Sequence, residues 1–299
     1  MKKARILLIG INGRLGWELQ RTCATLGEIV TADFPELNLA HPKKLGALLK
    51  NIQPDMIINA AAYTNMDQAE TEIKLARKVN ALSPGVLAQY AARHNIGLIH
   101  YSTDYVFDGQ KGSSYLETDI PNPINTYGTT MLEGEQTVHD TCCAYFIFRT
   151  SWVYSLRQGG FVNKVMKWAR EQKILRVVDD QISNPTWARM LAEATAQVIA
   201  QGDHNLIHFM KEHAGLYHLA GSGEVTRYEW ARRILALDPK MREHVMEELK
   251  PAKTIDFPTA AVRPRNTTLN MQRFEETFNI TLPHWDASLQ LAMSECSKV

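Results

Sequence analysis

The sequence has little cysteine and no long apolar run, and each shortage excludes a class of protein. Its four cysteines, at positions 23, 142, 143 and 296, include no C-x-x-C pair, so they predict neither a metal site nor a disulfide framework. A reducing, cytoplasmic setting is the simplest interpretation. No run approaches the ~20 apolar residues that a membrane span needs.

The sequence also has almost no net charge, because 33 Lys and Arg residues face 32 Asp and Glu residues. This balance gives no sign of a nucleic-acid or membrane-surface partner. The opening residues, MKKARILLIGINGRLG, combine two lysines with an apolar run, as a signal peptide does. That run is too short, and a glycine turn with Asn12 and Arg14 interrupts it, so a β-strand is expected there.

What the 299-residue chain does contain is an alternation of apolar runs and helical patterns through its first half. Continuously apolar strands separated by helices predict a parallel sheet covered on both faces. The expected fold is α/β, a doubly wound, Rossmann-like sheet that binds ligands beyond the carboxyl ends of its strands. The strands are expected at 4–9, 28–32, 55–60, 97–102 and 144–149, and the helices at 14–26, 42–51, 82–94 and 126–139.

The alternation weakens after about residue 150. We expect residues 1–150 to form a dinucleotide-binding domain and residues 151–299 a smaller mixed α/β substrate-side lobe, with some chain returning to the first domain. A Pro-, Thr- and Asn-rich segment, FPTAAVRPRNTTLN, reads as an ordered loop. The other elements expected here are helices at 160–172, 187–201, 226–236, 271–278 and 285–297, and strands at 174–178 and 215–219.

Gly10, Gly13 and Gly16 follow the first expected strand and open the first helix. Glycines here let the backbone approach a pyrophosphate and point helix N–H groups at it. Asp33 ends the second strand, where a carboxylate accepts hydrogen bonds from an adenine ribose. Because a carboxylate repels a 2′-phosphate, Asp33 favours NADH, whereas Arg14 could pair with that phosphate of NADPH. A purely structural turn is the competing interpretation.

Two hydroxyl groups stand at the expected ligand edge of the sheet. The fourth strand runs into HYSTDYVFDG, which places Thr103 at its carboxyl end. Tyr127 begins a helix some 24 residues later, after PNPIN. This spacing lets the strand-end hydroxyl and the helical phenol meet on one substrate oxygen, although each could instead have a local role, Thr103 as a cap and Tyr127 in packing.

Together these motifs resemble the extended short-chain dehydrogenase/reductase family, and more narrowly its dTDP-4-dehydrorhamnose reductases. The resemblance covers nearly the whole chain and rests on NAAAYTNMDQAE, HYSTDYVFDG, NPINTYG, FRTSWVY, DDQISNPTWA and RPRNTTLN. It implies that Thr103 and Tyr127 hold the C4 carbonyl oxygen of a nucleotide-linked 4-keto-6-deoxysugar, most simply dTDP-4-dehydro-L-rhamnose. Hydride would arrive from NADPH or NADH. The residues that it places near the substrate are Thr64, Thr103, Tyr105, Trp152 and Arg263.

The cofactor side shows one mild departure from the family. Where the family usually has an acid near the adenine, this chain has Asn38, whose amide can still hydrogen-bond. The small residues of NAAAY, 59–63, would let a dinucleotide lie close to the backbone, although a tightly packed strand end is an alternative. The full set expected at the cofactor is Gly10, Asn12, Gly13, Arg14, Leu15, Gly16, Asp33, Asn38, Leu39, Ala60, Ala61, Ala62, Tyr63 and Tyr127.

A larger departure is Met131, where the family's Y-x-x-x-K pattern has lysine. Tyr127 and Met131 are four residues apart on a helix and therefore share a face. A lysine there favours the tyrosinate and holds the nicotinamide ribose, and methionine does neither. We therefore expect a slow reductase, unless a cation from elsewhere in the chain replaces the lysine.

Two interpretations of the whole chain stay open. The first is the sugar-nucleotide reductase, and the second is a catalytically silent dinucleotide-binding subunit with a regulatory or scaffolding role. The absence of the lysine favours the second, whereas the retention of Thr103, Tyr127 and Trp152 favours the first. The sequence leaves the oligomeric state undecided, with a homodimer among the options.

Overall fold

The structure is a computed structural model that describes residues 4–157, 159–202 and 205–296. Within these residues, six strands form one sheet of order β10-β5-β4-β3-β1-β2, and every neighbouring pair is parallel. The expected doubly wound α/β fold is therefore confirmed. The strands of this sheet are β1 (Arg5–Ile9), β2 (Glu28–Ala32), β3 (Met56–Asn59), β4 (Gly97–Thr103), β5 (Tyr145–Thr150) and β10 (Gly215–His218).

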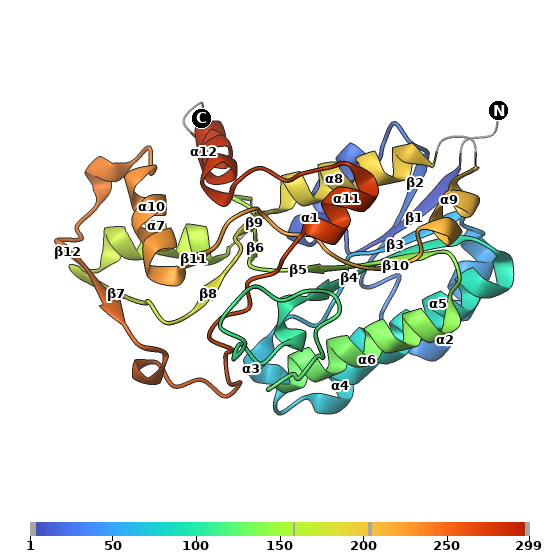
Figure 1. Ribbon diagram of the computed structural model, residues 1–299, viewed down its shortest axis with the longest axis horizontal. Coiled ribbons are helices and arrows are strands. Elements are labelled where there is room, and N and C mark those ends of the chain that lie inside the picture. The colour runs from blue at the N-terminus through green and yellow to red at the C-terminus, as the bar shows by residue number, and fades with distance from the viewer. Residues whose placement is uncertain (1–3, 158, 203–204, 297–299) are drawn as a thin grey trace.

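Helices cover both faces of this sheet (Figure 1). One face carries α2 (Pro42–Ile52), α5 (Ser83–His94) and α6 (Thr126–Thr141). The other carries α1 (Arg14–Thr22), α8 (Ala188–Gln201), α9 (Leu206–Glu212) and α11 (Gln272–Phe278). Three short elements connect β3 to α5, namely α3 (Met66–Ala69), α4 (Ile73–Arg77) and a π-helical turn at Lys78–Leu82.

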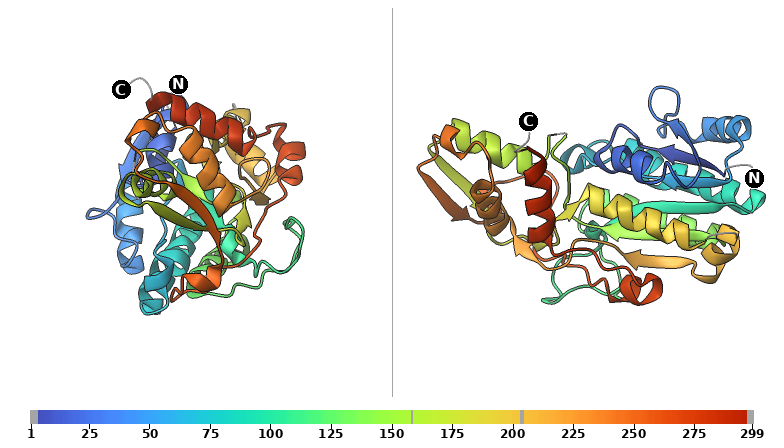
Figure 2. Two further views of the ribbon diagram at one scale, coloured as in Figure 1. Left: turned by 90° about the vertical axis from the view of Figure 1, so that its left-hand side faces the viewer. Right: turned by 90° about the horizontal axis from the view of Figure 1, so that it is seen from above.

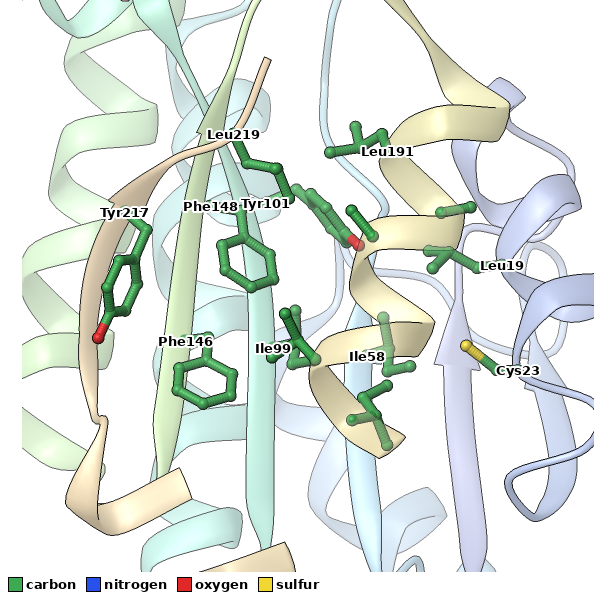
Figure 3. Close-up of a cluster of buried hydrophobic side chains, with 14 of the residues drawn as sticks. Leu19, Cys23, Ile58, Ile99, Tyr101, Phe146, Phe148, Leu191, Tyr217 and Leu219 are labelled. Carbon is green, nitrogen blue, oxygen red and sulfur yellow. The ribbon is translucent and has the colours of Figure 1, made fainter. Parts of the chain in front are cut away.

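The strands are apolar on both sides because each side packs against a helical layer. Successive residues of β1 show this, since Ile6 and Leu8 belong to the core under α1 and α8, while Leu7 and Ile9 belong to the core under α2 and α5. This alternation is the period of two that a strand imposes on its side chains. Figure 3 shows the first core, in which the aromatic rings of β5 and β10 lie toward one side, Leu19 of α1 and Cys23 directly after α1 lie toward the other, and Ile58 and Ile99 stand between them.

The remaining chain forms a second group of elements at one end of the molecule (Figure 2). Its own core is rich in tryptophan and valine, with Trp230 and Val162 fully buried. Within it β7 pairs with β12, β6 with β9 and β8 with β11. The elements are β6 (Val153–Tyr154), α7 (Phe161–Glu171), β7 (Ile174–Val178), β8 (Ile182–Ser183), β9 (Thr186–Trp187), β11 (Val225–Thr226), α10 (Arg227–Ala236), β12 (Glu248–Ala252) and α12 (Trp285–Cys296), with 3-10 turns at Met241–Glu243 and Thr254–Asp256. A further 3-10 turn, Asp104–Val106, directly follows β4 of the main sheet.

A buried ion pair holds α6 against β5. The Nε and Nη2 atoms of Arg149 donate to the two carboxylate oxygens of Glu135 at 2.8 and 2.6 Å. Both side chains are only 3% exposed. Because α6 carries Tyr127 and β5 ends beside the carboxyl end of β4, this pair fixes the spacing between the helix and the strands that form the site.

Glu135→Gln should lower the free energy of unfolding by about 3–5 kcal/mol, because the buried guanidinium would lose its counter-charge. Denaturant unfolding at pH 7 measures this. The matched control is Glu133→Gln on the same helix, whose pair with Arg77 lies at the surface and should contribute no more than about 1 kcal/mol. Equal losses in the two variants would contradict the prediction.

Candidate active site

A cavity of about 860 Å³ opens at the carboxyl ends of β1, β3, β4 and β5 and extends to α7 and α10. This volume lies within the range of small-molecule sites. Among the residues expected from the sequence, those that line the cavity are Gly10, Asn12, Gly13, Arg14, Leu15, Asp33, Ala60, Ala61, Ala62, Thr64, Thr103, Tyr105, Tyr127 and Trp152.

The glycine turn between β1 and α1 has no room for a side chain at Gly10 or Gly16. Gly10 adopts a φ of +93°, and a Cβ on it would lie 2.8 Å from the backbone of Ala60. A Cβ on Gly16 would lie 2.0 Å from the Gly10 carbonyl oxygen, so Gly16 lets α1 pack directly on the turn. Gly13 begins the helix without a side-chain cap. Backbone N–H groups at a bare helix start are the groups that bind a pyrophosphate, so the turn fits a dinucleotide.

Gly16→Ala should lower the free energy of unfolding by about 1–3 kcal/mol, because the added methyl group must push α1 away from the turn. It should also weaken the binding of NADPH, since the N–H groups of the turn move with the helix. Denaturant unfolding and NADPH fluorescence measure the two effects. The control is Gly46→Ala in the exposed middle of α2, where a Cβ meets no heavy atom within 4 Å and should stabilise the helix by up to about 1 kcal/mol.

Asp33 lies beside the glycine turn, directly after β2. Its Oδ2 accepts from the Asn12 backbone N–H at 3.1 Å, and its Oδ1 accepts from that of Phe34 at 2.9 Å. Arg14, by contrast, turns to the second group of elements, where its Nη2 donates to the Gly159 carbonyl. Burial lowers the pKa of this guanidinium. The structure thus places the carboxylate against the turn, while Arg14 ties the chain after β6 to α1.

Four residues expected at the cofactor do not line the cavity. Gly16 packs within the turn, as described above. Leu39 is buried in the core under α2, and Asn38 accepts from the Ala40 N–H through its Oδ1 at 2.9 Å. The Tyr63 hydroxyl donates to Glu72 at 2.6 Å. The side chains of Asn38, Leu39 and Tyr63 are therefore engaged in local contacts.

The Thr103 hydroxyl and the Tyr127 phenol meet in the cavity. Thr103 is the last residue of β4, and Tyr127 lies in the first turn of α6, which Asn125 caps by accepting from the Gly128 N–H at 2.8 Å. Both functional side chains are buried. Burial raises the pKa of the Tyr127 phenol, and its hydrogen bond with Thr103 opposes that rise.

Thr103 itself is held by its neighbours. Its Oγ1 accepts from the Tyr105 N–H at 3.2 Å and donates to Asp104 at 3.2 Å. Burial raises the pKa of Asp104 to about 6, and hydrogen bonds from Thr267, Thr103 and Ser183 oppose this. The strand-end hydroxyl is therefore fixed in position.

Met131 is buried beside the phenol, with 2% of its surface exposed. It packs with Tyr105, Tyr127, Ala69 and Ala76 in a small apolar cluster and also lines the cavity. Among the described residues, the groups whose charge acts on the pKa of Tyr127 are Asp104 and Tyr105, and both raise it. No cation from elsewhere in the described chain takes the place of a lysine at the phenol.

Aromatic side chains also line the cavity. Trp152, just after β5, adopts a φ of +39°, a left-handed conformation that a bulky residue keeps only under constraint. Its ring stacks on Trp230 with the centroids 5.5 Å apart. Tyr105 meets Tyr127 edge to face at 5.8 Å. Thr64 lies at the exposed margin.

Arg263, also expected near the substrate, lines an adjoining cavity of about 280 Å³ instead. Its Nη2 pairs with Asp67 at 2.8 Å. The backbone of the same loop is held by Asp67 as well, since the Ala261 N–H donates to the second carboxylate oxygen at 3.0 Å. Asp67 therefore fixes the loop after β12 next to α3.

Several residues that line the cavity are not predicted from the sequence. The Ser102 and Thr150 hydroxyls are buried there without a hydrogen-bond partner among the described residues. The sequence does contain a pattern that indicates them, because Ser102 and Thr150 each stand at or next to the carboxyl end of a predicted strand. Lys164 on α7 and Arg227 on α10 line the cavity too, but their place depends on how the second group of elements packs, which no local pattern reveals.

Comparison with known proteins points to one family. The family model described as the RmlD substrate binding domain matches residues 4–298. The dTDP-4-dehydrorhamnose reductase of Salmonella typhimurium is 37% identical over 297 residues, which cover 97% of each chain. The crystal structure of such a reductase from Clostridium acetobutylicum superposes with a TM-score of 0.88 at 31% identity, covering 98% of this chain and 99% of the other. That of the Bacillus anthracis reductase in complex with NADP gives 0.87 at 31% identity, covering 99% and 100%.

Proposed function

The chain belongs to the RmlD substrate-binding domain family, and from this we propose that it is an NAD(P)H-dependent reductase of a sugar nucleotide. The substrate is a nucleotide-linked 4-keto-6-deoxysugar, most simply dTDP-4-dehydro-L-rhamnose, whose C4 ketone is reduced to give dTDP-L-rhamnose. The observation that carries the proposal is the meeting of Thr103 and Tyr127 in a cavity that also contains the glycine turn.

The residues that would hold the dinucleotide are those of the glycine turn, Asp33 and Ala60 to Ala62, which lie along the carboxyl ends of β1, β2 and β3. Asp33 would accept hydrogen bonds from the adenine ribose. When bound, the reduced nicotinamide supplies the hydride. The small side chains of the cavity floor keep the backbone accessible to it.

The chain's own contribution is proton transfer and orientation. Tyr127 donates a proton to the C4 oxygen, and the raised pKa of the buried phenol keeps that proton in place at neutral pH. Rotation of the Thr103 hydroxyl from Asp104 to the same oxygen polarises the carbonyl. Within the described part of the chain, no cation acts on the tyrosinate that remains, and each unit by which the pKa of Tyr127 is raised corresponds to about 1.4 kcal/mol. The reaction is therefore expected to be slow.

An absorbance assay tests the proposal. The protein, at high concentration, is mixed with dTDP-4-dehydro-L-rhamnose and with NADPH or NADH in separate cuvettes, and absorbance at the reduced nicotinamide band is followed for hours. Substrate-dependent oxidation supports the reductase, and the faster cofactor gives the preference. Tight cofactor binding without any oxidation would overturn the proposal in favour of a silent dinucleotide-binding subunit.

We also propose a cellular location and an oligomeric state for the protein. Cys23, Cys142 and Cys143 are free thiols, and no helix of the described residues is both long and apolar enough to cross a membrane. The free thiols support a cytoplasmic location, which fractionation would test. We further propose a homodimer, which sedimentation equilibrium would distinguish from a monomer.

A further inference from the structure

Arg227 begins α10 and holds its guanidinium among three aromatic rings. The guanidinium carbon lies 3.6 Å from the centroid of the Trp152 ring, 4.8 Å from that of Phe161 and 5.5 Å from that of Trp230. Stacking of this kind uses the flat faces of the guanidinium and leaves its N–H edges available. Among the described residues, no carboxylate forms an ion pair or a hydrogen bond with it.

The Arg227 side chain is partly buried, and its charge has no direct counter-charge among the described residues. Burial lowers its pKa to about 10, so the guanidinium stays protonated at neutral pH. Asp104 lies close enough to act on that pKa, but its oxygens are occupied by Thr103, Ser183 and Thr267. A partly desolvated cation without a paired carboxylate is stabilised when an anion reaches it.

A second cation lies across the smaller cavity. Arg263 lines it together with Arg227, and the charge of Arg263 lowers the pKa of Arg227. The Nη1 atom of Arg263 is buried and has no hydrogen-bond partner among the described residues. Two arginines that repel each other, each with unused N–H donors, are suited to an anion with several oxygens.

The two cavities meet at a defined place. Among the described residues, Met66, Tyr105 and Arg227 line both of them. The larger cavity contains the reactive pair Thr103 and Tyr127. In a sugar nucleotide the diphosphate joins the sugar to the nucleoside, so a sugar in the larger cavity and a nucleoside in the smaller one put the diphosphate at this junction. Arg227 is the charged residue there.

We propose that Arg227 binds the diphosphate of the sugar nucleotide and thereby positions the sugar against Thr103 and Tyr127. The inference rests on the proposed function, because it takes the substrate to be a sugar nucleotide. It also assigns the cavity of about 280 Å³, with the half-exposed Phe257 ring at its edge, to the nucleoside. Trp152 is then held in its constrained conformation by the same guanidinium that binds the substrate.

Calorimetric titration with dTDP and with thymidine tests the inference without any turnover. In the wild-type protein the diphosphate should increase affinity strongly, and Arg227→Met should reduce the ratio of the two affinities by about 10- to 100-fold, the effect of losing charge-assisted hydrogen bonds. Methionine keeps the apolar length between the rings. Arg227→Lys, which keeps the charge, should retain part of the ratio. Arg232→Met, on the exposed face of the same helix, should leave the ratio unchanged.

The outcomes separate the inference from the proposed function. If Arg227 only supports Trp152, Arg227→Met weakens dTDP and thymidine equally and the ratio stays constant, which overturns the inference. Equal affinity of the wild-type protein for dTDP and thymidine would overturn it as well. A ratio that falls as expected, in a protein that never oxidises NADPH, supports the anion site while the reductase proposal fails. NADPH binding and thermal unfolding of each variant confirm that it is folded.

Discussion

Tyr127→Phe should lower kcat for substrate-dependent NADPH oxidation by about 10²–10⁴-fold, because the change removes the proton donor alone. The ring stays in its packing, edge-on to Tyr105. The binding of NADPH and the free energy of unfolding should therefore change little. Steady-state kinetics at saturating cofactor, with a separate NADPH titration, measure the two effects.

The matched control for this variant is Tyr90→Phe. The Tyr90 hydroxyl donates to the Leu49 carbonyl at 3.0 Å, between α5 and α2 and away from the cavity. Removing it should leave kcat unchanged. A loss of kcat of less than about tenfold in Tyr127→Phe would be smaller than the effect expected of a general acid. It would mean that another group donates the proton.

The main sheet could be predicted from the sequence because its signals are local. Residues such as Ile57 and Ile99 are apolar in unbroken runs, since both faces of each strand are buried, and the helices between the runs are long. The connection from β3 to α5 could not be predicted in the same way. There α3 and α4 have four and five residues and are followed by a π-helical turn. Helices of this length are too short for the helical period of apolar residues to repeat.

In the candidate site, too, only the residues with a local sequence signal could be predicted. Residues at strand ends, such as Gly10, Asp33 and Thr103, could be placed because parallel strands end at a common edge. Arg227 could not, since its position depends on the packing of α10 against Trp152 and on no pattern around it. For Asn38 a family position predicts a place at the cofactor; its Oδ1 accepts from the Ala40 N–H in the structure, and contact with the cofactor stays a prediction.

Met131→Lys should raise kcat for reduction by at least about tenfold, a small part of the ~10²–10⁴-fold that assistance to proton transfer contributes. Met131 is buried beside Tyr127 on the same face of α6 and lines the cavity. An ammonium group there would stabilise the tyrosinate that the reaction leaves, by about 1.4 kcal/mol for each unit by which the pKa of Tyr127 falls. Met131→Gln, similar in length but uncharged, should give no such gain.

The pH dependence of the two proteins separates charge from packing. Burial raises the pKa of Tyr127 in the wild type, so the phenol stays protonated at pH values above ~10, its ordinary pKa. Ionisation of Tyr127 should therefore cause no loss of reduction below pH ~10. In Met131→Lys the pKa is lower, so the alkaline loss of reduction should move to lower pH. Alcohol oxidation, which needs the tyrosinate, should then begin at lower pH. A variant that binds both ligands but shows neither shift and no gain in kcat would contradict the role assigned to the missing charge.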